Sequence, residues 1–216
     1  MQSQQAAEIA WVEGEIGELV RDAAVAYTQD DRRTIRLVAQ SGRIFFLKLA
    51  PTLMPERERL DWLADMLPVP KVCAFRRGDP VDWLLTREIP GENLVSERNL
   101  ADPGRVVQLL AGALRRIHSL DPSGCPFRAD GTEDGVVVHG DACLPNFLVH
   151  NARISGYLDL GSCRVASPTV DLQAAVWSLR YNLGDGWGGP FLSAYRWKAS
   201  DPETVKSFVS AYENAS

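Results

Sequence analysis

Residues 136–161 read VVVHGDACLPNFLVHNARISGYLDLG, and this stretch decides how the rest of the chain is interpreted. It contains three side chains that can handle metal ions or protons, Asp141, Asn146 and Asp159, within 19 positions. Two short apolar runs lie between Asn146 and Asp159. If these runs pair as an antiparallel hairpin, both ends of the stretch meet at one place.

Phosphoryl transfer is a reaction that needs this set of side chains. It requires a divalent metal ion between phosphate oxygens, a carboxylate that orients and deprotonates the acceptor hydroxyl, and cations over the phosphates. Carboxylate and amide oxygens suit Mg²⁺, so Asn146 and Asp159 can hold the metal from opposite ends of the hairpin. Asp141 can then serve as the base. The alternative is that all three residues only shape turns, which Asp and Asn favour.

A second hairpin is predicted upstream, in TIRLVAQSGRIFFLKLAP (34–51), around the turn sequence Gln-Ser-Gly. Lys48 lies on its second strand in an otherwise apolar context, where it can reach the α- and β-phosphates of a nucleotide. The following PERERLDWLADML (55–67) has apolar residues at helical spacing and stops before Pro68, which predicts a helix. A strand lysine followed by a helix that carries glutamate is the order of parts in protein kinases.

The pattern of the chain changes near residue 90. DWLLTREIPGENL (82–94) predicts a buried strand that breaks at Pro-Gly, and DPGRVVQLLAGALRRIHSLD (102–121) predicts an amphipathic helix with an Asp-Pro start. The sequence therefore predicts an α+β fold with two lobes. Residues 1–89 form a small β-rich nucleotide-binding lobe, with a hinge near 86–91. Residues 90–216 form a mainly helical lobe that holds the catalytic loop and the substrate site.

The composition is that of an ordinary soluble globular protein. The 216 residues are 45% hydrophobic and 24% charged, with a net charge of −5, which favours neither nucleic acid nor an anionic membrane as partner. No signal peptide and no run of 18 apolar residues is present, so a cytoplasmic location is expected. The four cysteines have no zinc-site spacing and are interpreted as free thiols, with Cys143 and Cys163 in packing roles.

Two further residues are assigned to the support of the catalytic loop. His139 is interpreted as a structural residue that fixes the loop by hydrogen bonds rather than as a proton carrier. Asp171, on the next predicted helix, is expected to hold the catalytic loop in place. The alternative for Asp171 is a surface charge in the first turn of that helix.

The residues 136–161 resemble the signature of the aminoglycoside phosphotransferases, especially the branch that modifies the 3′-hydroxyl. The similarity continues through FFLKLAP (45–51), WLLTREIPG (83–91), LRRIHSLDPSGCPF (114–127) and DLQAAVWSLRYNLGDGW (171–187). It covers most of the chain from about residue 34 to 195. The resemblance implies a protein-kinase-like fold and ATP-dependent phosphorylation of a small-molecule hydroxyl, with a cationic aminoglycoside as one candidate acceptor.

The resemblance also implies roles for single residues. Asp141 is expected to be the catalytic base, and Asn146 and Asp159 are expected to bind Mg²⁺. Lys48 is expected to contact the ATP phosphates and to face Asp159 across the cleft. Glu56 is its expected partner, with Glu58 as the other candidate for that role. The hinge residues Arg87 to Ile89 are expected to take the adenine by backbone hydrogen bonds.

The chain also departs from the family pattern. Family members usually carry a long helical segment between the Cys-Pro-Phe sequence and the strand before His-Gly-Asp, and it supplies much of the acidic aminoglycoside pocket. Here residues 128–135 make that connection directly, with only Asp130, Glu133 and Asp134 as acids. The loop TQDDRR (28–33) is not glycine-rich, although it stands where the phosphate-covering loop is expected. We therefore expect weak activity on aminoglycosides.

Two alternatives follow from these departures. The first is a kinase of another small acceptor, such as another antibiotic, a sugar or an amino alcohol. The second is a catalytically inert, nucleotide-binding kinase-like module. The complete set of Lys48, Asp141, Asn146 and Asp159 opposes the inert module. The sequence leaves open the acceptor and its phosphorylated position, the preference for ATP or GTP, and the oligomeric state.

Overall fold

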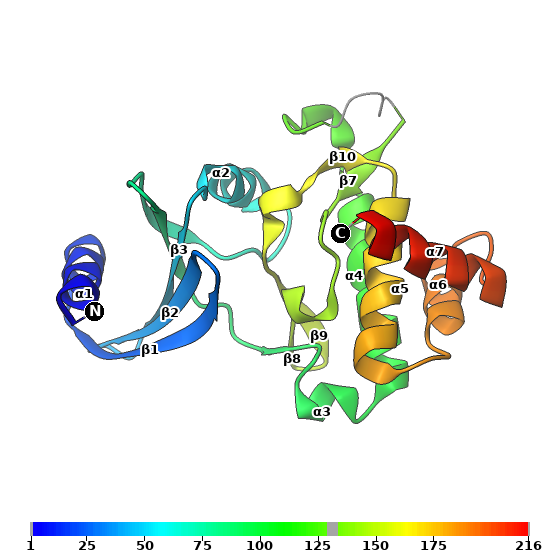
Figure 1. Ribbon diagram of the computed structural model, residues 1–216, viewed down its shortest axis with the longest axis horizontal. Coiled ribbons are helices and arrows are strands. Elements are labelled where there is room, and N and C mark those ends of the chain that lie inside the picture. Colours follow the sequence, from blue (N-terminus) through cyan, green and yellow to red (C-terminus); the bar gives the residue numbers. More distant parts are fainter. Residues whose placement is uncertain (1, 129–133, 216) are drawn as a thin grey trace. The chain divides into compact units, whose positions relative to one another are not determined.

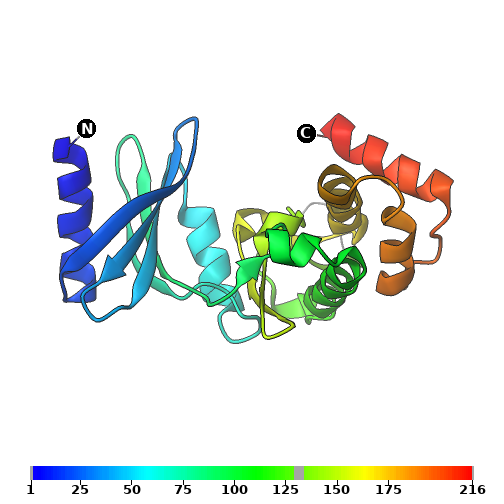
Figure 2. The same ribbon diagram turned by 90° about the horizontal axis from the view of Figure 1, so that it is seen from below.

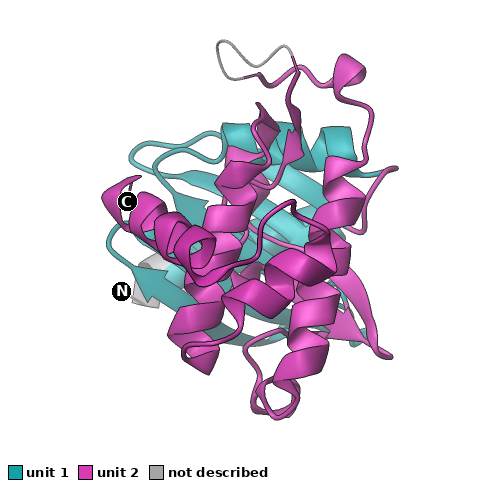
Figure 3. Ribbon diagram, turned by 90° about the vertical axis from the view of Figure 1, so that its right-hand side faces the viewer, with its two compact units in different colours: residues 1–64, 69–89 teal, residues 65–68, 90–216 magenta. Residues whose placement is uncertain are grey.

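A computed structural model describes residues 2–128 and 134–215, in two compact units. Unit 1 comprises Met1–Ala64 and Val69–Ile89, and unit 2 comprises Asp65–Pro68 and Pro90–Ser216 (Figure 3). Asp130 and Glu133 lie outside the described residues. Unit 1 is rich in strands and unit 2 is mainly helical, so the predicted α+β composition is confirmed.

Unit 1 is a five-stranded antiparallel sheet with one helix on each face (Figures 1 and 2). The strand order is β1-β2-β3-β5-β4. The strands are β1 (Val20–Gln29), β2 (Arg32–Ala39), β3 (Ile44–Ala50), β4 (Val72–Arg76) and β5 (Asp82–Arg87), and the helices are α1 (Gln2–Ile16) and α2 (Met54–Leu63). Strands β2 and β3 form the hairpin predicted from the sequence.

Strand β3 shows why the lysine lies where it does. Leu47 and Leu49 are buried in the core between the sheet and α1, together with Val12 of that helix. Side chains alternate between the two faces of a strand, so Lys48 projects from the opposite face, on which α2 lies (Figure 1). Each of these fully buried aliphatic side chains contributes about 2 kcal/mol to stability.

Two elements of unit 1 were not predicted from the sequence, and a third, helix α2, ends earlier than predicted. Helix α1 and strand β1 precede the predicted hairpin, and β1 is exposed along most of its length, so it lacks the alternation of a half-buried strand. Helix α2 ends at Leu63, before the predicted end at Leu67. The following segment belongs to unit 2, where the Pro68 carbonyl accepts a 3.0 Å hydrogen bond from the Tyr157 amide. This tertiary contact overrides the helical pattern of the sequence.

Unit 2 combines helices with two small sheets, of order β6-β8-β9 and β10-β7. Its helices are α3 (Glu97–Leu100), α4 (Pro103–His118), α5 (Thr169–Leu183), α6 (Gly188–Tyr195) and α7 (Pro202–Ala215). Its strands are β6 (Glu92–Asn93), β7 (Val136–Val138), β8 (Phe147–His150), β9 (Arg153–Tyr157) and β10 (Arg164–Ala166). Short 3₁₀ turns, η1 (Pro122–Gly124), η2 (Leu144–Asn146) and η3 (Leu160–Ser162), connect them.

Helix α4 begins and packs as its sequence predicts. The side chain of Asp102 accepts a 3.1 Å hydrogen bond from the Arg105 amide, and Pro103 occupies the first turn. The apolar face, including the fully buried Leu110, Leu114 and Ile117, lies in the core of unit 2. The hydroxyl of Tyr157 donates to the Ala113 carbonyl at 3.1 Å, which ties this helix to β9. Among the described residues, no helix combines the length and apolar character that spanning a membrane requires.

Candidate active site

The hairpin β8–β9 brings the two expected metal ligands to the same end of unit 2. Phe147 pairs with Tyr157, and the Asn146 carbonyl accepts a 2.8 Å hydrogen bond from the Leu158 amide. Asn146 immediately precedes β8, and Asp159 immediately follows Leu158 after β9. The meeting of the two ends of the hairpin, predicted from the sequence, is therefore observed.

The amide of Asn146 also orients Asp141. Its Nδ2 donates to the backbone carbonyl of Asp141 at 2.9 Å and to the carboxylate Oδ2 at 3.0 Å. Asn146 is 9% exposed, so this geometry is held by its surroundings. Because Nδ2 is the donor toward Asp141, the Oδ1 atom is directed elsewhere and can serve as a ligand for a cation.

Asp171 is the buried acceptor that fixes the loop before Asp141. Its carboxylate is fully buried and accepts hydrogen bonds from the backbone amides of His139 at 2.7 Å and Gly140 at 2.8 Å. The same carboxylate lies 2.9 Å from Nε2 of His118, whose Nδ1 lies 2.7 Å from the hydroxyl of Tyr195. The network joins α4, α5, α6 and the catalytic loop, so Asp171 is not a surface charge.

Gly140 permits a close approach between two loops. Its φ is +86°, a conformation that residues with a Cβ rarely adopt. A Cβ atom at this position would lie 2.3 Å from the carbonyl oxygen of Ser162. The loop that carries Asp141 therefore lies directly against the backbone that follows Asp159, which itself has a left-handed φ of 56°. Only glycine fits between Asp141 and His139 in this arrangement.

His139 has the environment of a structural residue. Its ring is fully buried and lies 5.3 Å from the ring of Phe147, centroid to centroid. Its Nδ1 accepts a 3.3 Å hydrogen bond from the Asp141 amide, which leaves the proton of the neutral ring on Nε2. Burial lowers the pKa of His139, against the opposing charges of Asp171, Asp141 and Asp159. A neutral imidazole that holds the loop is the role this geometry supports.

Cys143, two residues after Asp141, is not a nucleophile. Burial, followed by the negative charge of Asp141, raises the pKa of its thiol to about 12. A thiol is reactive as its thiolate, and almost none is present at neutral pH. Like Cys73, Cys125 and Cys163, it carries no disulfide.

In unit 1, Lys48 has a carboxylate partner on α2. Its Nζ lies 2.7 Å from Oε2 of Glu56, and the two side chains are 23% and 13% exposed. Glu58, the other candidate from the sequence, is exposed. The contact occurs on the face of the sheet opposite α1. It holds the ammonium group in a defined position on β3.

The expected adenine-binding segment lies at the end of β5. The Arg87 amide donates to the Lys71 carbonyl at 2.9 Å, and the Glu88 amide donates to the Ile44 carbonyl at 3.0 Å. Both amides are therefore used within unit 1. Ile89 is the next residue and the last of this unit.

The oxygen donors at the hairpin end suit a magnesium ion that also binds phosphate. Within residues 2–128 and 134–215, no group of three or more His, Cys, Asp or Glu side chains could hold a metal by itself. Mg²⁺ commonly takes one or two protein oxygens and completes its shell with water and substrate phosphates. One carboxylate, Asp159, and one amide oxygen, that of Asn146, match this donor set.

One contact of the site had no signal in the sequence. Ser178 on α5 is buried, and its Oγ accepts a 2.9 Å hydrogen bond from the Leu144 amide in the turn after Asp141. A serine inside a predicted helix gives no indication of its partner, because the partner is 34 residues away. Together with Asp171, Ser178 makes α5 the support of the whole catalytic loop.

A family model described as a phosphotransferase enzyme family matches residues 15–135 and 129–208 of the chain. The two matched stretches overlap at residues 129–135, within the connection that precedes β7.

Curated relatives match most of the chain. The aminoglycoside 3'-phosphotransferase of Niallia circulans is 30% identical over 217 residues, with 78% of this chain and 82% of the relative covered. That of Streptomyces ribosidificus is 31% identical, with 69% and 76% covered. The streptomycin 3''-kinase of Streptomyces griseus is 27% identical, with 74% and 79% covered.

Solved structures show the same fold. A crystal structure of an aminoglycoside-3'-phosphotransferase of type VIII has a TM-score of 0.73 and 24% identity, covering 86% of this chain and 91% of its own. An aminoglycoside phosphotransferase from Streptomyces rimosus has a TM-score of 0.74 and 21% identity, covering 94% and 95%. The kinase-like α+β fold predicted from the sequence is therefore confirmed.

Proposed function

The chain belongs to the phosphotransferase enzyme family, and we propose that it transfers the γ-phosphoryl group of ATP to a hydroxyl of an aminoglycoside. The observation that carries the proposal is the hydrogen bond from Asn146 Nδ2 to the Asp141 carboxylate at the end of the hairpin that also bears Asp159. In this proposal Asp141 is the base, and Asn146 and Asp159 are the two oxygen ligands beside it. This is the constellation that phosphoryl transfer to an alcohol needs.

Asp141 is the catalytic base in this proposal. Its carboxylate is oriented by Asn146, and its backbone is held through His139 and Asp171. It would accept the proton of the acceptor hydroxyl as the oxygen attacks the γ-phosphorus. Positioned general bases contribute roughly 10² to 10⁴ in rate.

Asn146 and Asp159 would hold Mg²⁺ in the proposed enzyme. When bound, the ion neutralises charge on the phosphate oxygens and fixes their orientation. Asn146 would contribute Oδ1 and Asp159 its carboxylate. Asp159 is the only charged ligand of the pair, so it would supply most of the electrostatic attraction for the ion.

Lys48 and the hinge would bind the nucleotide. The ion pair with Glu56 supports the role of Lys48, because it holds the ammonium group ready for the α- and β-phosphates. The amides of Arg87 and Glu88 already donate within unit 1. We therefore propose that the amide of Ile89 and the carbonyl of Arg87 form the hydrogen bonds with the edge of the adenine ring.

The acceptor is assigned from the relatives and from the chain's own sequence. The relatives that match most of the chain are named as kinases of aminoglycosides, which supports that acceptor class. The short connection before β7 supports the second candidate, a kinase of another small hydroxyl compound, because fewer residues remain to enclose a multi-ring antibiotic. The ordered set of Asp141, Asn146 and Asp171 argues against an inert module.

The proposal is tested by measuring ADP release from purified protein with ATP and Mg²⁺. The acceptors are kanamycin, streptomycin, hygromycin B, simple sugars and amino alcohols, and Asp141→Ala is the matched control. Phosphorylation of an aminoglycoside by the wild-type protein alone supports the proposal. Phosphorylation of the sugars or amino alcohols alone selects the second candidate. ATP binding without transfer to any acceptor selects the inert module.

A further inference from the structure

Three aromatic side chains form one surface on α5 and α7, called the aromatic platform here: Trp177, Tyr181 and Tyr212. Trp177 and Tyr181 lie one turn apart on α5 and are stacked, with ring centroids 5.2 Å apart and an interplanar angle of 14°. The ring of Tyr212 on α7 lies 5.0 Å from that of Trp177, at 32°. The three rings therefore form a continuous aromatic surface.

The platform borders the catalytic loop. The hydroxyl of Tyr212 lies 3.6 Å from Sγ of Cys143, whose pKa is raised by burial and by the carboxylate of Asp141 beside it. Ser178, the residue after Trp177, accepts the hydrogen bond from the Leu144 amide. Both contacts attach the same turn of α5 and the end of α7 to the loop that carries the proposed base. The loop that carries Asp141 is therefore in contact with both helices that carry the platform.

Tyr181 presents a ring to solvent that nothing in the fold explains. It is 75% exposed, the most exposed large apolar or aromatic residue that the structure records. One face of its ring stacks on Trp177, and this leaves the other face for a ligand. An exposed aromatic ring offers an apolar face on which a ligand ring can stack.

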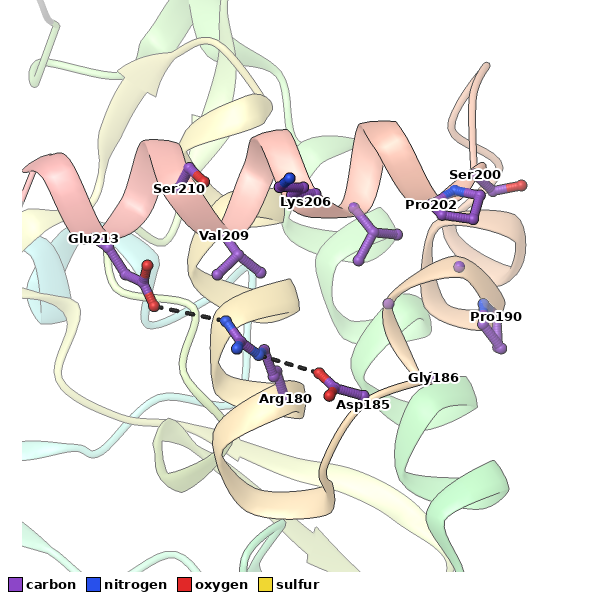
Figure 4. A pocket seen from close by; sticks show the side chains of 13 residues that line it. Arg180, Asp185, Gly186, Pro190, Ser200, Pro202, Lys206, Val209, Ser210 and Glu213 are labelled. Carbon is purple, nitrogen blue, oxygen red and sulfur yellow. Dashed lines mark hydrogen bonds and ion pairs between the residues drawn. The ribbon is translucent and has the colours of Figure 1, made fainter.

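The neighbouring carboxylates are already paired with a cation. Arg180, next to Tyr181 in sequence, lies 3.1 Å from the carboxylate of Asp185 and 3.8 Å from that of Glu213 (Figure 4). These residues line a cavity of about 640 Å³ between α5, α6 and α7. Because Arg180 neutralises part of their negative charge, Asp185 and Glu213 attract a cationic ligand less strongly than isolated carboxylates would.

We propose that the aromatic platform is the ring-binding site of the acceptor. The inference rests on the proposed function for the position of the hydroxyl at Asp141. The apolar face of the ring would lie on the outer face of Tyr181, and the same aromatic face would attract a nearby ammonium group. Tyr181 is then a specificity-determining residue.

The proposal predicts a different salt response from that of an acidic pocket. Exposed ion pairs are screened by salt, whereas stacking and burial of apolar ring faces are not. Raising NaCl from about 0.05 to about 0.5 M should change the acceptor Kd by less than about threefold. A steep loss of affinity with salt would overturn the proposal in favour of carboxylate recognition.

The decisive experiment compares Tyr181→Ala with Tyr181→Phe and Glu213→Gln. Binding of kanamycin, streptomycin and hygromycin B is measured by calorimetry without nucleotide, and the acceptor KM, ATP KM and kcat are measured with it. Tyr181→Ala should raise the acceptor Kd and KM about tenfold, while Tyr181→Phe stays near wild type. The ATP KM, kcat and Tm should stay unchanged, because an exposed tyrosine has no structural role.

The outcomes separate this inference from the proposed function. Binding that Tyr181→Ala weakens, without any phosphorylation, supports the platform and contradicts the kinase activity. Phosphorylation with an acceptor KM that Tyr181→Ala leaves unchanged overturns the platform and preserves the activity. A loss of affinity in Glu213→Gln but not in Tyr181→Ala also overturns it, as does failure of all three probes to bind the wild-type protein.

Discussion

The carboxylate of Asp171 lies 2.7 Å from the backbone nitrogen of His139, although the side chain of Asp171 has no exposure to solvent. An ionised carboxylate in such a place is stable only when hydrogen bonds satisfy it. Asp171 receives them from the catalytic loop and from His118 on α4. The residue is therefore both a requirement of the fold and the point that sets the position of the proposed base.

Replacement of Asp171 by Asn should destabilise the protein by about 3 kcal/mol. An amide has only one oxygen, so it cannot accept the hydrogen bonds that both carboxylate oxygens accept, and a buried N–H donor is left unpaired. Urea denaturation measures the free energy of unfolding. The control is Asp185→Asn, since the Asp185 side chain is 89% exposed and its ion pair contributes at most about 1 kcal/mol. Similar losses in the two variants would contradict the assigned role of Asp171.

Gly140→Ala should disrupt the catalytic loop. The added Cβ would lie 2.3 Å from the Ser162 carbonyl and at a positive φ, so a cost above about 2 kcal/mol is expected, together with loss of turnover. Gly14→Ala is the control. Gly14 lies in α1 with nothing within 4 Å of a new Cβ, and alanine there should stabilise by up to about 1 kcal/mol. Thermal unfolding of both variants checks the prediction.

Asp141→Ala should abolish turnover and leave ATP affinity nearly unchanged. The proposed role of Asp141 concerns the acceptor hydroxyl, whereas the phosphates and the metal are assigned to other groups. A fall in kcat of roughly 10² to 10⁴ is expected. Calorimetric titration with ATP and Mg²⁺ measures the affinity. A variant that keeps most of its kcat would refute the role of the residue.

Glu56→Gln should raise the ATP KM about tenfold, because the charged partner that positions Lys48 is lost. The matched control is Glu58→Gln on the same helix, where the side chain is exposed. Its ATP KM should stay within about twofold of wild type. If the control variant showed the larger effect, the partner of Lys48 during catalysis would be Glu58.

The stability of the protein should fall as the pH decreases from 7 to 5.5, in part because of His139. Burial lowers the pKa of His139 in the folded state, so below about pH 6.5 the unfolded chain binds a proton that the folded chain does not. The stabilisation is complete above the unfolded pKa and is lost as the pH falls toward the folded pKa. A single site gives a slope of at most about 1.4 kcal/mol per pH unit.

Chemical denaturation across this pH range tests the slope with two variants. His139→Gln removes the titrating group and should flatten the dependence, whatever its effect on overall stability. His150→Gln, at an exposed position of β8, should keep the wild-type slope. An unchanged slope in His139→Gln would show that other groups cause the pH dependence.

The sequence predicts local structure well. The hairpin that carries Lys48, the amphipathic helix after Asp102 and the pairing of strands around residue 150 all depend on contacts between nearby positions. Turn residues and apolar periodicity encode such contacts directly. The same is true of the spacing between Asp141, Asn146 and Asp159.

Contacts between distant segments could not be predicted. Glu8 is 1% exposed and pairs with Arg33, although it stands in a polar N-terminal stretch that gave no helix prediction. Tyr212 contacts Cys143 across 69 positions, and a tyrosine near the end of a helix gives no sign of this partner. Such pairs depend on tertiary structure, which a single sequence does not reveal.

The pairing of β7 with β10 has a consequence for the history of such enzymes. Val138 pairs with Arg164 and Val136 with Ala166. Strand β7, which leads into the loop with Asp141, is therefore held by β10, which follows the turn after Asp159. The chain before β7 is attached to the same strand, because Arg128 forms a bridge with Val165 and the Phe127 carbonyl accepts a 2.8 Å hydrogen bond from the Val165 amide. An insertion or deletion between Arg128 and Val136 would leave both attachments in place, so the length of this connection can vary during evolution without displacing the loop that carries Asp141.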